Sequence, residues 1–112
     1  MKLRIYQINT QLDNDRIKFL SYREQRVITG MNMLNAKIYT KVFDGELDVD
    51  AVDDYDACEE VFCLFNTEIP NGFKGHSLSV SDVIEFVREN ISAFYYVDTF
   101  GIEKVEFNYY DI

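Results

Sequence analysis

The fold of this 112-residue chain is decided by the stretch VIEFVRENISAFYYV at residues 83–97. Two segments within it, Val83–Val87 and Ala93–Val97, are rich in the β-branched and aromatic residues that favour strands. The residues between them, Arg88–Ser92, suit the connection of a hairpin. This stretch therefore predicts two neighbouring antiparallel strands joined as a hairpin.

Further strands are predicted on both sides of this hairpin. Lys2–Ile8 alternates its side chains between two faces, which is typical of a strand in a sheet. Asp98–Gly101 is predicted to be a turn. Strands are also expected where short apolar or β-rich runs occur, at Ile17–Leu20, Ala36–Leu47, Leu78–Val80 and Glu103–Phe107.

A short helix is predicted at Tyr22–Thr29. Ser21 and Glu24 have the spacing of a capping box, in which each side chain caps the backbone N–H of the other. Gly30 follows at the place where a C-terminal cap would need the left-handed conformation.

The main helix is predicted at Asp50–Phe65, with Asp50 as its N-terminal cap. Apolar residues fall close to helical spacing along it, at Val52, Tyr55, Cys58, Val61, Phe62 and Phe65. The opposite face of this helix is acidic. Together these elements predict an α+β fold, in which an antiparallel sheet of about four to six strands carries the main helix on one face, beside a second short helix.

The composition favours one folded domain spanning residues 1–112. Hydrophobic residues make up 47% of the chain and aromatic residues 15%, far more than in a disordered segment. No apolar run approaches the ~20 residues that cross a bilayer. Met1–Tyr6 lacks the continuous apolar stretch of a signal peptide. We therefore expect a cytoplasmic protein that does not contact a membrane.

Residues that bind metals or catalyse reactions are scarce. Cys58 and Cys63 would face different ways on a helix, so both are expected to be reduced, buried structural thiols. His76 is the single histidine. A calcium loop starting at Asp48 fails at its sixth position, which requires glycine but holds Asp53. No metal site, cofactor or catalytic residue is predicted.

Two local patterns are better explained by structure than by chemistry. Residues 75–82 contain Ser, His and Asp, but members of a catalytic triad converge from separate parts of a fold. Four tyrosines could stack nucleic-acid bases only beside basic residues, yet Lys104 is the only basic residue after Arg88. Sheet packing is therefore expected for Tyr95, Tyr96, Tyr109 and Tyr110.

Charge is the most informative bulk property. The net charge is −9, and nine acidic residues with no basic one lie between Asp44 and Glu60. Such a chain is repelled by free nucleic acid and attracted to basic clefts of other proteins. The alternative is a solvated surface that only supports solubility. The residues expected to contact a basic partner are Asp48, Asp50, Asp53, Asp54, Asp56, Glu59 and Glu60.

Two blocks, GHSLSVSDVI at residues 75–84 and YYVDTFGI at residues 95–102, resemble the signature of the YodL-like domain. That domain occurs in proteins of conjugative and other mobile elements of Gram-positive bacteria. Earlier pieces such as RIYQ at residues 4–7 and FLSY at residues 19–22 also fit, so the resemblance spans nearly the whole chain. It implies no chemistry at particular residues, but it implies a setting of counter-defence and transfer.

In that setting the chain is similar to small acidic anti-CRISPR proteins that inhibit type II-A RNA-guided nucleases. This similarity implies a non-enzymatic inhibitor that binds the CRISPR nuclease or its guide RNA complex and blocks guide loading or DNA binding. The alternative is an accessory protein-binding domain of the mobile element with no role in CRISPR inhibition. An enzyme that cuts guide RNA ranks third, because only His76 and the crowded acids could serve it. The oligomeric state stays open, with a homodimer as one alternative.

Overall fold

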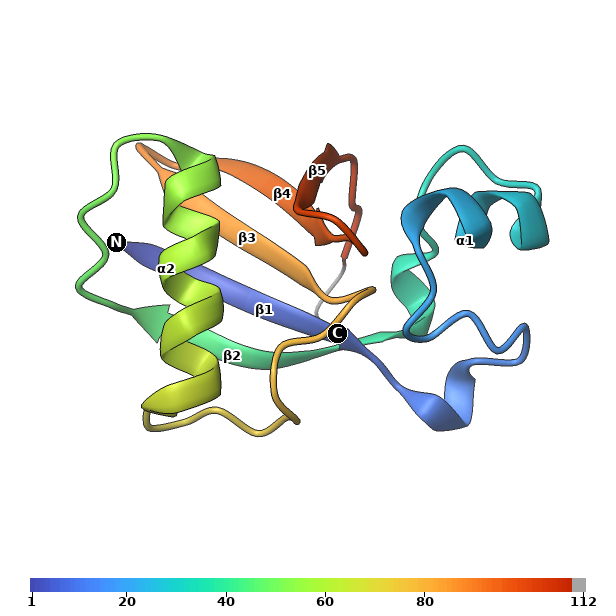
Figure 1. Cartoon of the computed structure of the whole chain (residues 1–112), viewed down its shortest axis with the longest axis horizontal. Coiled ribbons are helices and arrows are strands. Elements are labelled where there is room, and N and C mark those ends of the chain that lie inside the picture. Colours follow the sequence, from blue (N-terminus) through green and yellow to red (C-terminus); the bar gives the residue numbers. More distant parts are fainter. Residues whose placement is uncertain (110–112) are drawn as a thin grey trace.

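The computed structural model describes residues 1–109, in which five strands form one antiparallel sheet with the order β2-β1-β3-β4-β5 (Figure 1). The strands are β1 Lys2–Ile8, β2 Tyr39–Glu46, β3 Val83–Arg88, β4 Ile91–Val97 and β5 Ile102–Val105. The helices are α1 Tyr22–Thr29 and α2 Asp54–Thr67, with short 3₁₀ turns η1 Thr10–Leu12 and η2 Ala36–Ile38. The predicted α+β class is confirmed.

The hairpin predicted at residues 83–97 is present as β3 and β4. Its turn residues Glu89 and Asn90 both have positive φ angles, of 51° and 65°. Two successive left-handed residues are what a type I′ turn requires, and this turn matches the twist of the flanking strands. β3 is also paired with β1, so the hairpin lies at the centre of the sheet.

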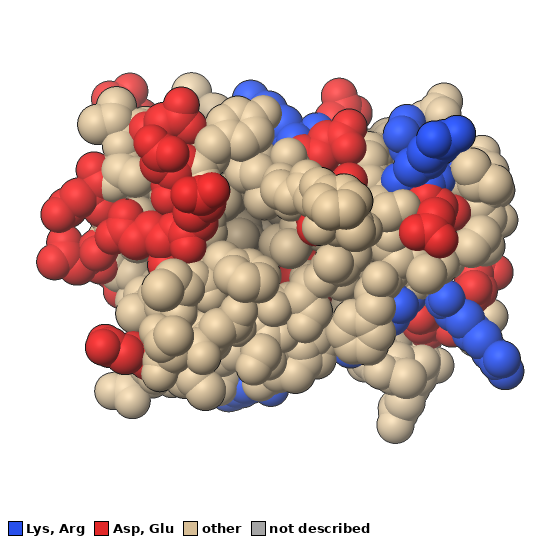
Figure 2. Space-filling model, viewed as in Figure 1, with Lys and Arg blue, Asp and Glu red and all other residues tan. Residues whose placement is uncertain are grey.

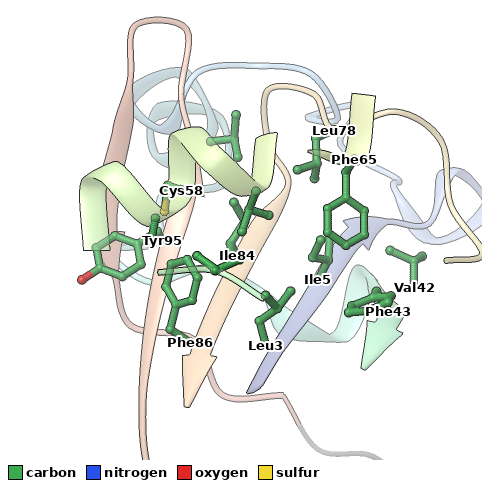
Figure 3. Close-up of a cluster of buried hydrophobic side chains, with 14 residues drawn as sticks. Leu3, Ile5, Val42, Phe43, Cys58, Phe65, Leu78, Ile84, Phe86 and Tyr95 are labelled. Atoms are coloured by element: carbon green, nitrogen blue, oxygen red, sulfur yellow. The ribbon is translucent and has the colours of Figure 1, made fainter. Parts of the chain in front are cut away.

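Both faces of the sheet are covered by apolar side chains. On one face α2 packs across the strands, and Phe65 of α2 lies in the middle of this core (Figure 3). The rings of Phe43 and Phe73 meet Phe65 edge-on, with centroids 5.0 and 4.9 Å away. The other labelled core residues include Leu3, Ile5, Ile84 and Phe86, which alternate along β1 and β3 with residues of the opposite face.

The opposite face has a second core at the end of the sheet where α1 lies (Figure 1). Tyr22 of α1 packs its ring on Tyr96, with the centroids 5.2 Å apart. Helix α1 has the predicted bounds. Ser21 Oγ accepts from the Glu24 backbone N–H at 3.1 Å, Glu24 caps the Ser21 N–H, and Gly30 has a φ of 69°. The short-helix prediction is therefore confirmed in full.

The predicted strand at Ile17–Leu20 is wrong, because this segment is a turn. Phe19 has a φ of 72°, which an extended strand does not allow. The backbone N–H groups that a strand would offer to a neighbour are instead taken by side chains. The Asp13 carboxylate accepts from Ile17 and Lys18, and Ser81 Oγ accepts from Phe19.

The predicted strand at Leu78–Val80 is also wrong. Leu78 is buried in the core below α2, but its backbone N–H donates to Asn66 Oδ1 at 2.9 Å. The Ser79 N–H donates to Asp82 Oδ2 at 2.8 Å. These side-chain acceptors hold the segment as a loop, so its apolar residues reach the core without pairing to the sheet.

Several predicted boundaries also need correction. Helix α2 ends at Thr67 rather than Phe65, and β4 begins at Ile91 rather than Ala93. Helix α2 begins at Asp54, and its cap is Asp53, whose side chain accepts from the Tyr55 N–H at 2.7 Å. Asp50 therefore does not cap it; it lies in a non-helical stretch in which Val49 is buried in the core. The strand predicted from residue 36 begins only at Tyr39, after η2, and the last strand is Ile102–Val105 rather than Glu103–Phe107.

Candidate functional site

Six of the seven acids predicted to contact a partner are exposed: Asp48, Asp50, Asp53, Asp56, Glu59 and Glu60. We call these six residues the acidic face. They lie on the loop between β2 and α2 and on the first turns of α2. Figure 2 shows most of the acidic atoms on this side of the molecule gathered at that end, whereas basic side chains appear mainly toward the α1 end. The concentration of acids along the sequence is thus also a concentration in space.

The seventh acid, Asp54, has a structural role. Its Oδ1 accepts from Arg88 Nη2 at 2.8 Å and Nε at 3.0 Å, and its Oδ2 accepts from the Tyr95 hydroxyl at 2.6 Å. Burial and the neighbouring Asp54 carboxylate raise the pKa of Tyr95. Asp54 is half-buried and ties the start of α2 to β3 and β4, so both of its oxygens are already occupied.

In the part of the chain that the structure describes, the acidic face has no counter-charge of its own. Among residues 1–109, no Lys or Arg forms an ion pair with any of its six carboxylates. Asp44 and Glu46, at the edge of the same segment, are paired with Arg4, Lys41 and the N-terminal amine. Like charges at helical spacing, such as Asp56 and Glu60, destabilise a helix by a few tenths of a kcal/mol. The face therefore provides an attractive field for a cationic partner.

Four residues expected in the core are exposed instead. Val52, just before α2, is 93% exposed, and Tyr55 is 54% exposed. Phe62 retains 41% of its surface and Cys63 is also exposed, whereas Cys58, Val61 and Phe65 are buried. The expectation that both cysteines are buried is therefore wrong for Cys63, although neither forms a disulfide.

The exposed side of α2 borders an apolar groove that the sequence interpretation missed. The groove has a volume of about 380 Å³ and lies between α2 and the turn that joins β4 to β5. Phe62 and Cys63 belong to its helical wall, and Thr99, Gly101 and Ile102 belong to the facing wall. In the sequence, the only sign of this groove is that Phe62 and Cys63 are apolar residues beside the buried stripe of α2, which contains Cys58, Val61 and Phe65.

The Ser, His and Asp of residues 75–82 do not form a catalytic array. His76 Nδ1 lies 2.7 Å from the Ser77 carbonyl oxygen and 3.3 Å from Gln7 Nε2, and within the described chain its ring makes no hydrogen bond to a serine hydroxyl. Asp82 Oδ2 accepts from Gln7 Nε2 at 3.0 Å. Gln7 thus links the loop to β1, and these polar residues hold the backbone together.

Asp82 is fully buried, and this desolvation raises its pKa to about 7 despite the hydrogen bonds that it accepts. A carboxyl whose pKa is higher in the folded state binds its proton more tightly there. Its contribution to stability is therefore complete below the unfolded pKa, near 4, and is lost as the pH rises through about 7.

We expect Asp82→Asn to flatten this pH dependence. In the wild type, deprotonation of Asp82 should lower the free energy of unfolding by up to about 1.4 kcal/mol per pH unit between pH ~5 and ~7. The asparagine variant should lack that component, whatever its absolute stability. Urea denaturation at several pH values measures both slopes, and equal slopes in the two proteins would contradict the assignment.

The tyrosines considered for base stacking are engaged in packing where the structure describes them. Tyr95 and Tyr96 are buried, and the Tyr96 hydroxyl donates to the Leu20 carbonyl oxygen at 2.7 Å. Tyr109 is half-buried against Tyr6, with ring centroids 4.8 Å apart. Tyr110 lies outside the described residues.

No group of three or more His, Cys, Asp or Glu side chains within residues 1–109 has the arrangement to hold a metal ion. No helix in this range is long and apolar enough to span a bilayer.

Comparison with known protein families identifies a domain family that spans nearly the whole chain. A family model described as a YodL-like domain matches residues 2–107, which includes all five strands, both helices and the acidic face. No curated protein and no solved structure matches the chain.

Proposed function

This chain belongs to the YodL-like domain family, and we propose that it is a non-enzymatic inhibitor of a type II-A CRISPR RNA-guided nuclease. It comes from a mobile element, acts in the cytoplasm of the bacterial host, and binds the nuclease or its guide RNA complex through the acidic face. Binding there blocks guide loading or DNA capture.

The observation that carries this proposal is the acidic face, with six exposed carboxylates at one end of the molecule and no basic partner among residues 1–109. Type II-A nucleases hold the guide–target duplex in a positively charged channel and read the flanking motif with arginines. A dense set of carboxylates on a rigid helix and loop can occupy such a surface in place of nucleic-acid phosphates. The same charge keeps the protein off free DNA.

The test is a DNA-cleavage assay with a purified type II-A nuclease, in which the protein is added before or after guide loading, at low and moderate salt. We expect inhibition that weakens about tenfold or more as salt rises, because added ions screen exposed charges. The order of addition that preserves inhibition identifies the blocked step. Absence of both inhibition and co-purification would instead favour an accessory protein-binding domain of the mobile element.

The same assay distinguishes an inhibitor from an enzyme. Guide RNA incubated with the protein alone should remain intact under our proposal. Guide cleavage that disappears in His76→Ala would overturn it, because His76 is the only histidine available as a general base.

A further inference from the structure

The apolar groove beside α2 follows from the dimensions of the fold. Strands lie about 4.8 Å apart, so five of them make a sheet wider than one helix, whose diameter is about 10–12 Å. On the β2 side of α2 the loop that follows the helix closes the gap, because Phe73 packs on Phe65 and the Lys74 N–H donates to the Val42 carbonyl oxygen of β2. On the β4–β5 side no segment within residues 1–109 fills it, and the groove remains.

The rim of this groove is acidic. Glu59 and Asp98 line it, and no Lys or Arg is among the described residues that do so. Glu59 belongs to the acidic face as well, so groove and acidic face form one continuous surface on α2. An apolar cleft bordered by carboxylates is complementary to an apolar side chain that is flanked by cations.

A second copy of this chain is the main competing occupant. Phe100 is 94% exposed on the β4–β5 turn, next to the groove, and could enter the groove of a neighbour. Such a pairing would bring two chains of net charge −9 together at their acidic rims. That repulsion disfavours the dimer and favours a basic partner.

We propose that this groove receives one large apolar side chain from a basic segment of the partner protein, while lysines or arginines on either side of it contact Glu59 and the acidic face. This inference rests on the proposed function, because it assigns the anchoring point of the same docking surface. The acidic face supplies attraction over distance, and the groove supplies specificity, since a buried anchor in a desolvated pocket dominates binding energy.

Cys63 is a natural reporter of groove occupancy. Its thiol is exposed and lines the groove, so a bound side chain should shield it from alkylation. Cys58 also borders the groove, but it is only 2% exposed and desolvation raises its pKa to about 12, so it should stay unalkylated with or without a bound side chain. Mass spectrometry after iodoacetamide treatment distinguishes the two sites.

The experiment uses two short synthetic peptides that carry lysines and arginines on both sides of a central residue, which is phenylalanine in one and glycine in the other. We expect the phenylalanine peptide to bind the full chain about tenfold more tightly or better, given the transfer free energy of a buried aromatic side chain. It should also slow Cys63 alkylation, and the glycine peptide should not.

Each other outcome overturns the inference in a distinguishable way. Equal binding of both peptides without protection of Cys63 would reject the groove but keep the acidic face as a docking surface. Failure of both peptides to bind at low salt would reject both ideas. Protection of Cys63 that rises with protein concentration in the absence of peptide would assign the groove to a second copy.

A pair of variants checks the site independently of the thiol. Phe62→Ser removes apolar surface from the groove wall and should abolish the preference for the phenylalanine peptide. Val27→Ser removes a 75% exposed apolar side chain on α1 that does not line the groove, and it should preserve that preference. An unchanged preference in Phe62→Ser, with the fold intact by circular dichroism, would also overturn the assignment.

Discussion

Reversing four charges on the acidic face is expected to weaken inhibition of the nuclease at least about tenfold at low salt, while the free energy of unfolding changes by no more than about 1 kcal/mol. The variant carries lysine in place of Asp48, Asp50, Glu59 and Glu60, all of which are exposed. Each exchange adds two positive units, so the net charge changes from −9 to −1.

Inhibition should change much more than stability, because these four carboxylates attract a partner but do not hold the fold together. Glu59 and Glu60 follow Asp56 by three and four residues, where like charges repel. Lysines at those two positions would convert repulsive pairs into attractive ones. Asp53 and Asp54 are left unchanged, because one caps α2 and the other binds Arg88 and Tyr95.

A matched control changes net charge equally without touching the acidic face. Lysines are introduced at four exposed acids elsewhere, Asp15, Glu68, Glu103 and Glu106. Titration in the cleavage assay should show near wild-type inhibition for this control. If both variants lose inhibition equally, total charge and not the acidic face is responsible; if neither does, the contact residues are wrongly assigned.

The largest effect on stability is expected from Phe65→Ala, which should lower the free energy of unfolding by about 3–5 kcal/mol. Phe65 has no exposed surface and lies between the rings of Phe43 and Phe73. Truncation leaves a cavity between α2 and the sheet. The strands below it cannot move in to fill the cavity without breaking their backbone pairing. Since domains of this size are stable by only about 5–15 kcal/mol, the variant should be close to unfolded at 37 °C.

Phe62→Ala is the paired control on the same helix. Phe62 is 41% exposed and borders the groove, so its truncation should cost about 1 kcal/mol or less. Urea denaturation followed by circular dichroism gives both values. Comparable losses from the two substitutions would mean that Phe62 is part of the core and that the groove is not an open surface.

The sequence alone was sufficient for features whose interactions are confined to a few neighbouring residues. Helix α1 was located to its exact ends, because Ser21, Glu24 and Gly30 cap it locally. The β3–β4 hairpin was predicted for the same reason. β1 and the helical character of α2 were predicted from the periodicity of their apolar residues, although β1 pairs with distant strands. The acidic concentration between Asp44 and Glu60 was also visible at once, since charge depends on composition alone.

The strand predictions from local sequence pattern were wrong where a distant side chain accepts a hydrogen bond from the backbone N–H. Ile17–Leu20 has the apolar content of a strand, but the hydroxyl of Ser81, 62 positions away, binds the Phe19 N–H. Asn66 likewise holds the Leu78 N–H across 12 positions. No pattern within either segment indicates such partners, because the competition between strand pairing and side-chain capping is decided only when the chain is folded.

The surfaces that remain available to a partner depend on the tertiary structure. Asp54 looks in sequence like the other acids of its segment, yet Arg88, 34 positions away, removes it from the acidic face. Phe62 looks like a core residue, yet one helix is too narrow to cover five strands, and this leaves its side chain beside an open groove. Charge and periodicity are properties of the sequence, whereas exposure depends on how segments far apart in that sequence pack together.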